Sequence, residues 1–136
     1  MRTAVDSSVL LDVLQADQKF GESSRTALKE ARRRGALVVC EVVVAELRAA
    51  FPDASPFVEA IELLGVRFEP LTLEAAALAG ASLRKGGRGP SLPGDFLIGA
   101  HAQTQADALL TRDGRFYRRH FPRLVVHNPT SRRGGR

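Results

Sequence analysis

Four acidic side chains lie at the borders of apolar segments, where placing a charge costs free energy unless the charge is paired. Asp6 follows the β-like run "TAV", Asp95 separates a Pro-Gly turn from the largely apolar "FLIGAHA", and Asp113 comes two residues after "ALLT". Glu46 shares a helical face with Val43 and other apolar residues. Semi-buried like charges repel one another and stay ionised only if a positive group joins them. We therefore predict a divalent cation, since Mg²⁺ and Mn²⁺ prefer carboxylate oxygens and retain several waters.

Three of these acids also have a local alternative explanation. Asp95 can cap the helix that follows Pro93 and Gly94 by accepting backbone N–H bonds, and a carboxylate suits the positive end of a helix dipole. Asp6 and Asp113 are turn and cap formers in their own right. The local patterns leave both explanations open, so the choice depends on whether the fold brings the acids together.

The expected elements alternate between short strands and helices. Strands are predicted in "TAV", "ALVVC", "VRFEPL", "ADALLT" and "RLVVHNP", with helical patterns between them. The boundary between strand and helix in "EVVVAELRAAF" is uncertain, because this segment is β-branched at first and then rich in Ala and Leu. The alternation predicts an α/β fold, a three-layer α/β/α sandwich with a central, mostly parallel sheet.

Such a sheet would gather the acids at one rim. In open parallel sheets, ligands bind outside the carboxyl ends of the strands. Asp6 and Asp113 follow two strands, and Asp95 opens the helix whose far end feeds the "ADALLT" strand. Glu46 lies about a turn and a half into its helix, so its long side chain can reach back toward the same rim.

A local excess of arginine follows the last acid. Five arginines and a single acid, Asp113, lie between residues 112 and 123. Arg115, Arg118 and Arg119 have the spacing of one helical face, and cations beside an acidic metal site would hold the phosphates of a nucleic-acid strand. Tyr117 could stack on an unpaired base. The alternative is a merely solvated basic surface, and Asp12, on the first helix, is expected to be solvated as well.

Length and composition indicate one globular domain. The chain has 136 residues, of which 44% are hydrophobic, and three of its five net positive charges come from arginines in "TSRRGGR". We expect a domain over 1–129 and a disordered basic tail over 130–136. The single cysteine, Cys40, excludes an internal disulfide and a zinc cluster. No signal sequence or membrane span is evident, so a cytoplasmic location without membrane attachment is expected.

The acidic segments resemble a known family. The strings "VDSSVLLDVL", "VVVAELRAAF", "PGDFLIGAHA" and "LLTRDGRFYRRHFP" are similar, in order and spacing, to the four acidic motifs of the PIN domain, specifically of the VapC toxins of bacterial toxin–antitoxin pairs. The resemblance extends to about Pro129. One departure is that "TRDGRF" has Gly and Arg in the reverse of the family order "RDRGF", which concerns the turn after Asp113 and not the acid itself.

This resemblance implies a catalytic site and a set of partners. It implies a Mg²⁺- or Mn²⁺-dependent endoribonuclease, usually a homodimer, which a small VapB-like antitoxin protein neutralises. Metal ions on carboxylates can activate a water and stabilise the departing oxygen of a phosphodiester, so no nucleophilic side chain is needed. By this resemblance the metal-binding catalytic acids would be Asp6, Glu46, Asp95 and Asp113, with Ser8 and Thr111 as hydroxyls near the site. A position beside Asp113 adds, as further substrate-binding residues, Arg112, Arg115, Arg118 and Arg119.

Two other enzyme classes and one non-enzymatic class compete with this interpretation. Asp-nucleophile phosphatases need a second Asp two positions after the first, where this chain has Ser8, and receiver domains need a Lys after a late strand, whereas no Lys follows Lys85. A catalytically idle PIN-like domain that binds RNA or protein stays open. The retention of all four acids argues against it.

Overall fold

A computed structural model describes residues 1–86 and 93–130 of the chain. The strands are β1 (Thr3–Val5), β2 (Leu37–Val39), β3 (Val66–Phe68), β4 (Ala108–Leu110) and β5 (Val126–His127). The helices are α1 (Ser7–Leu14), α2 (Gly21–Arg34), α3 (Glu41–Ala49), α4 (Ala54–Leu64), α5 (Leu73–Gly86), α6 (Gly94–Gln105) and α7 (Gly114–His120). The predicted basic tail, apart from Thr130, lies outside the described residues.

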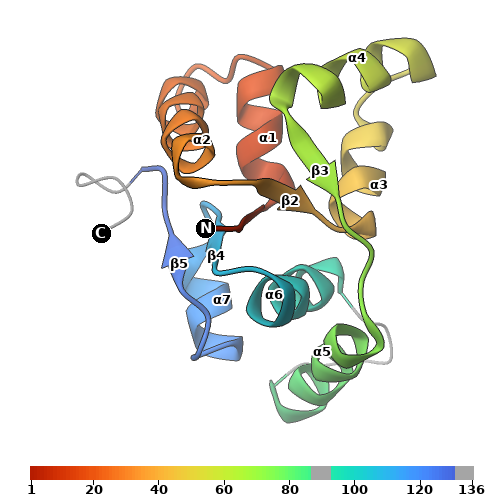
Figure 1. The fold of residues 1–136 in the computed structure, drawn as a ribbon, viewed down its shortest axis with the longest axis vertical. Helices are drawn as coiled ribbons and strands as arrows, with labels where there is room; N and C mark the ends of the chain where they lie inside the picture. Colours follow the sequence, from red (N-terminus) through yellow and green to blue (C-terminus); the bar gives the residue numbers. More distant parts are fainter. Residues whose placement is uncertain (87–92, 131–136) are drawn as a thin grey trace.

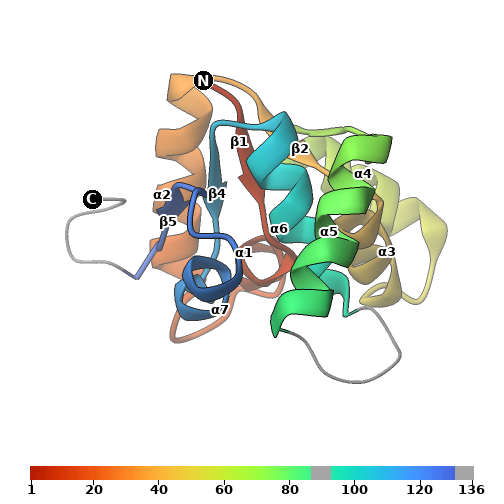
Figure 2. The ribbon, with the colours of Figure 1, turned by 90° about the horizontal axis from the view of Figure 1, so that it is seen from below.

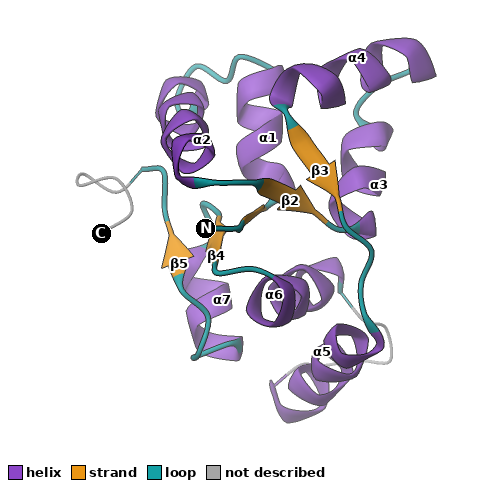
Figure 3. Cartoon of the chain, in the orientation of Figure 1, coloured by secondary structure: helices purple, strands orange, loops and turns teal. Residues whose placement is uncertain are grey.

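The five strands form one sheet in the order β3-β2-β1-β4-β5, and every pair is parallel. Figure 3 shows this sheet at the centre of the molecule with helices around it. The three central strands β1, β2 and β4 are buried along their whole length, which is why each is an unbroken apolar or β-branched run and not an alternating one. The predicted α/β class is confirmed, and the sheet is wholly parallel.

Helices cover both faces of the sheet. In Figure 1, α1, α2 and α4 lie above the strands, and α5, α6 and α7 lie below them. This division follows from right-handed crossovers, because the chain moves from β1 out to β3 and then returns past β1 to β4 and β5. No helix in the described ranges is both long and apolar enough to cross a membrane.

The uncertain boundary after "ALVVC" falls directly after Cys40. Helix α3 begins at Glu41, so the β-branched run 42–44 is helical. Val43 and Leu47 are almost fully buried on the face of α3 that packs against α1 and α6. Packing of this face outweighs the modest helix propensity of valine, and it carries Glu46 to the border of the site.

Close packing of α6 against the segment after α7 depends on Gly99. A Cβ atom built on Gly99 would lie 2.4 Å from Cε2 of Phe121, whose side chain is 1% exposed. The ring therefore occupies the place that any larger residue at 99 would need. Since α6 also carries Asp95, this contact helps to set the position of Asp95 at the edge of the sheet.

We expect Gly99→Ala to lower the free energy of unfolding by about 1–3 kcal/mol, because the buried Phe121 ring has to move. Gly80→Ala in α5 is the matched control, since no atom lies within 4 Å of its Cβ position and an alanine in an exposed helix should add about 0.5–1 kcal/mol. Urea denaturation measures both. Shifts of the same sign in the two variants would contradict this packing.

Candidate active site

Three of the four acids meet at the carboxyl edge of the sheet. Asp6, Asp95 and Asp113 line an open pocket of about 520 Å³, together with Ser7, Ser8, Leu11 and Arg112. We call it the acid pocket. Asp6 is buried at its base with 6% exposure, Asp95 is half-buried, and Asp113 is exposed at its mouth. The elements that supply them are the ends of β1 and β4 and the first turn of α6.

Hydroxyl groups hold the Asp6 carboxylate in place. Its Oδ2 accepts hydrogen bonds from Oγ1 of Thr111 at 2.7 Å and from Oγ of Ser8 at 3.3 Å. Thr111 Oγ1 in turn accepts the backbone N–H of Asp113 at 3.0 Å. Ser8 and Thr111, which the sequence placed near the site, therefore contact an acid, and Thr111 links Asp6 to the turn that carries Asp113.

The acids are not used as helix caps. Asp6 and Asp113 occupy the N-cap positions of α1 and α7, and Asp95 lies in the first turn of α6 after the N-cap Pro93. None of these three helices has a side-chain cap hydrogen bond. The local explanation for these residues is therefore incomplete, and their carboxylates are left facing the acid pocket.

Burial and mutual repulsion set the protonation of the buried acids. Burial raises the pKa of Asp6 above its ordinary value, and the charge of Glu46 adds to this against the Thr111 and Ser8 hydrogen bonds. The pKa of Asp95 is also raised, first by burial and then by the charges of Asp6, Glu46 and Asp113. A cation at the pocket would relieve this repulsion.

Glu46 lies at the border of the acid pocket and not in its lining. It is exposed on α3, and its Oε1 accepts a hydrogen bond from Oγ of Ser7 at 2.6 Å. The Ser7 hydroxyl also lies 3.5 Å from Oδ1 of Asp6, so it bridges two acids. Ser7 was not predicted as a site residue, although the two serines directly after Asp6 were the available signal.

The donor set suits a hard cation held partly through water. Among the described residues, no three His, Cys, Asp or Glu side chains are grouped as a ready-made metal site. The pocket offers carboxylate and hydroxyl oxygens around an open space, which fits Mg²⁺ or Mn²⁺ with several retained waters better than a closed cage. Asp6, Asp95 and Asp113 would hold such an ion, with Glu46 acting from the border.

Arg112 lines the acid pocket but is already paired. Its Nε donates to Oδ2 of Asp12 at 2.7 Å and its Nη2 to Oδ1 at 3.1 Å, while the guanidinium lies 4.0 Å from the centre of the Phe20 ring. Asp12 is buried and also accepts a hydrogen bond from Ser24 at 2.8 Å. The expectation that Asp12 is solvated is therefore wrong. The pair ties α1 and α2 to the turn that carries Asp113.

The other predicted arginines lie outside the acid pocket. Arg115, Arg118 and Arg119 are all exposed on α7. Arg118 folds back toward the start of α7, where its Nη1 lies 2.9 Å from the Cβ position of Gly114. Arg119 lines a separate pocket between α5 and α7. None of these three arginines therefore lines the acid pocket: Arg118 lies against the start of α7, and Arg119 lies in the pocket between α5 and α7.

Tyr117 is a buried neighbour of the acids. Its side chain is fully buried, so the expected stacking on a base is wrong. Within the described ranges its hydroxyl has no hydrogen-bond partner of good geometry. Burial first, and then the charges of Asp6, Asp95 and Asp113, raise its pKa, so it stays neutral and can donate toward the acids. Its place four residues after Asp113 was the only available signal.

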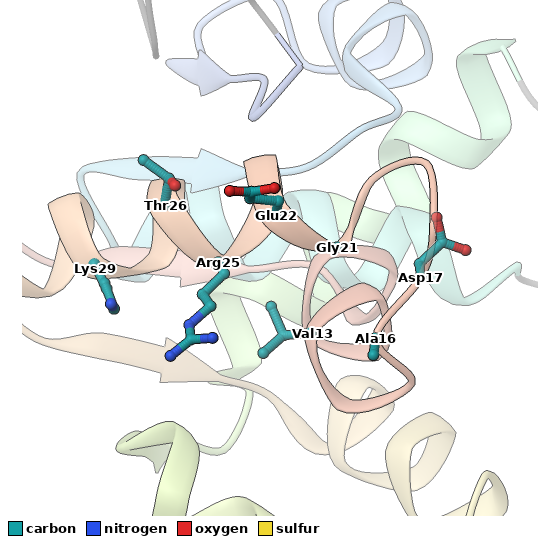
Figure 4. A pocket seen from close by; sticks show the side chains of 8 residues that line it. All are labelled: Val13, Ala16, Asp17, Gly21, Glu22, Arg25, Thr26 and Lys29. Carbon is teal, nitrogen blue, oxygen red and sulfur yellow. The ribbon is translucent and has the colours of Figure 1, made fainter.

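A second pocket, of about 510 Å³, lies between the end of α1 and α2, away from the acids of the rim. Figure 4 shows its charged side chains, with Arg25 and Lys29 on one side of α2 and Glu22 on the other, and Asp17 set apart on the loop. Acids and cations are interspersed here and no carboxylates converge. The acid pocket is therefore the candidate active site.

Comparison with known proteins identifies the family and the fold of this chain. A family model described as "PIN domain" matches residues 3–122. A VapBC2 structure from Rickettsia felis, bound to a promoter DNA fragment, has a TM-score of 0.72 at 16% identity, covering 94% of this chain and 98% of that one. VapBC-1 from nontypeable Haemophilus influenzae has a TM-score of 0.71 at 21% identity, covering 96% and 100%. Among curated protein sequences, none matches this chain.

The charge repulsion at the acid pocket can be measured as stability. A raised pKa means that the folded protein holds the proton more tightly than the unfolded chain. The metal-free wild type should therefore lose stability as pH rises from the ordinary Asp pKa of about 3.9 through the raised values of Asp6 and Asp95. We expect Asp95→Asn to lose less over this window and to melt higher at neutral pH without metal.

Millimolar Mn²⁺ should reverse the order of the two proteins. An ion that binds only the folded state adds about 2.7 kcal/mol at ~100 times its Kd, and Asp95→Asn should gain much less than the wild type. Asp53→Asn, an exposed residue without a side-chain hydrogen bond among the described residues, is the control. If Asp95→Asn and Asp53→Asn gave equal melting temperatures and equal Mn²⁺ shifts, the acids would not form a cation site.

Proposed function

Because this chain belongs to the PIN-domain family, we propose that it is a Mg²⁺- or Mn²⁺-dependent endoribonuclease. The single observation that carries the proposal is the acid pocket, where Asp6, Asp95 and Asp113 converge and the pKa of Asp6 and of Asp95 is raised. A site of this kind favours an ion that binds carboxylates and a substrate that brings phosphates to that ion.

The residues of the acid pocket would have different roles in RNA cleavage. A bound Mg²⁺ or Mn²⁺ would supply an activated water and stabilise the departing oxygen of the phosphodiester. Thr111 and Ser8 orient Asp6 by donating to its Oδ2, and this would fix the carboxylate for binding the ion. Tyr117 excludes water from behind the acids, because its ring is fully buried there.

Arg112 is suited to orient a phosphate at the mouth of the pocket. Two of its nitrogens are fixed by Asp12 and its plane rests on Phe20, yet 30% of its side chain is exposed. A guanidinium held in this way keeps donors for a phosphate oxygen without losing further side-chain freedom. The ion pair with buried Asp12 also keeps the Arg112 guanidinium from pairing with the carboxylates of the acid pocket.

We extend the proposal to a toxin of a toxin–antitoxin pair. The support is the likeness in fold to the VapBC structures and to FitAB, the last with a TM-score of 0.69 at 19% identity. The proposed partners are RNA as substrate, a small VapB-like antitoxin and a second copy of this chain. A catalytically idle PIN-like domain is the alternative, and the convergence of three acids on an open pocket disfavours it.

We expect the purified chain to cleave structured RNA in Mn²⁺ and not in EDTA, and Asp95→Asn to slow cleavage at least about a hundredfold. The amide keeps the shape of the side chain but removes the charge that holds the ion. Asp53→Asn should cleave at the wild-type rate. Gel analysis of the products measures the rates, and wild-type activity of Asp95→Asn in matched Mn²⁺ would refute the assignment. RNA bound but left intact by the wild type would favour the idle domain.

A further inference from the structure

A third pocket, of about 520 Å³, lies between the C-terminal end of α5 and α7. We call it the α5–α7 pocket. Its charged lining is entirely basic, with Lys85 from α5, Arg119 from α7 and Arg123 from the segment after α7. Figure 2 shows α7 and the C-terminal end of α5 in the lower part of the view.

The positive charge of this pocket has no local compensation. Within residues 1–86 and 93–130, none of Lys85, Arg119 and Arg123 forms an ion pair with an acid. The sequence contains no acid between Glu74 and Asp95 and none after Asp113. The pocket between α1 and α2 differs, because there Arg25 and Lys29 share the lining with acids. The α5–α7 pocket therefore attracts an anion.

The rest of the lining is suited to phosphate. Ser82 and Gln103 add neutral polar groups, and Arg119 and Arg123 can each contact two oxygens of one phosphate. His120 also lines the pocket and is held by aromatic neighbours, with its ring centre 4.9 Å from that of Phe96 and 4.6 Å from that of Phe116. One wall of the pocket is therefore fixed.

Helix α7 joins the two pockets, because Asp113 at its N-cap lines the acid pocket and Arg119 near its last residue lines the α5–α7 pocket. Helix α7 begins directly after Asp113, and Arg119 lies six residues further on, about 9 Å along the helix at 1.5 Å per residue. On the other side, α5 ends at Gly86 and α6 begins at Gly94, one residue before Asp95. Along α7, Arg119 therefore lies at the opposite end from Asp113.

We propose that the α5–α7 pocket binds a backbone phosphate of the RNA strand whose scissile phosphate lies at the acid pocket, through Lys85, Arg119 and Arg123. This inference rests on the proposed endoribonuclease function, whose own test is cleavage by the wild type. Chemistry and substrate holding are then divided between two pockets of opposite charge. Arg119, which the sequence predicted as a phosphate contact, lines the α5–α7 pocket, and the proposal adds Lys85 and Arg123 as further phosphate contacts.

The test is equilibrium binding of a fluorescein-labelled single-stranded RNA oligonucleotide from about 50 to 200 mM salt, in an Asp95→Asn background that leaves the RNA intact. The pocket variant is Lys85→Ala/Arg119→Ala/Arg123→Ala. The control, Lys29→Ala/Arg25→Ala/Arg33→Ala, removes the same charge from exposed residues of α2, on the other face of the sheet. Arg123→Glu alone serves as a second variant that leaves the other two residues unchanged.

We expect the pocket variant to bind RNA roughly tenfold more weakly than the control, with a salt slope shallower by at least ~0.7, the contribution of one phosphate contact on a single strand. Arg123→Glu should act in the same direction. Equal affinities and slopes for pocket variant and control would overturn the proposal, as would loss of antitoxin binding with RNA binding unchanged. The endoribonuclease function is tested separately, by cleavage of structured RNA by the wild type in Mn²⁺, and does not depend on the result of this binding experiment.

Discussion

The structure depends on holding three carboxylates close together at the edge of a buried sheet. Asp6 is 6% exposed at the end of β1, and the repulsion of Asp95 by Asp6, Glu46 and Asp113 acts against folding when no cation is present. The surrounding contacts offset this cost. Thr111 and Ser8 bond to Asp6, and the apolar strands and the α6 contact at Gly99 fix the elements rigidly. The carboxylates can be held close together because the buried apolar core, and not the acids, stabilises the fold.

The distribution of positive charge follows from the same constraint. A free cation inside the acid pocket would compete with a metal ion, and the arginine beside it is instead fixed to Asp12 and stacked on Phe20. Lys85, Arg119 and Arg123, which form no ion pair within the described parts of the chain, line the pocket at the other end of α7. The basic residues that would attract a phosphate strand and the acids that would bind a metal ion therefore lie at opposite ends of α7.

The sequence predicted the scaffold better than the side-chain network. Strands such as "ALVVC" are recognisable because burial on both faces leaves only apolar residues, and the acids that follow them mark the rim. The Asp12–Arg112 pair joins residues 100 apart, so no local pattern reports it, and Tyr117 faces inward although its neighbours on α7 are charged. The start of α3 at Glu41 was ambiguous because packing, and not propensity, decides it.

The location of a bound ion tests the central claim most directly. Crystals of the protein grown or soaked with Mn²⁺, measured at a wavelength where manganese scatters anomalously, would show the metal position without reference to activity. The account predicts an anomalous peak in the acid pocket, in contact with Asp6 and Asp95 or Asp113 directly or through one water. A peak confined to other residues, or none at Mn²⁺ concentrations that raise the melting temperature, would contradict it.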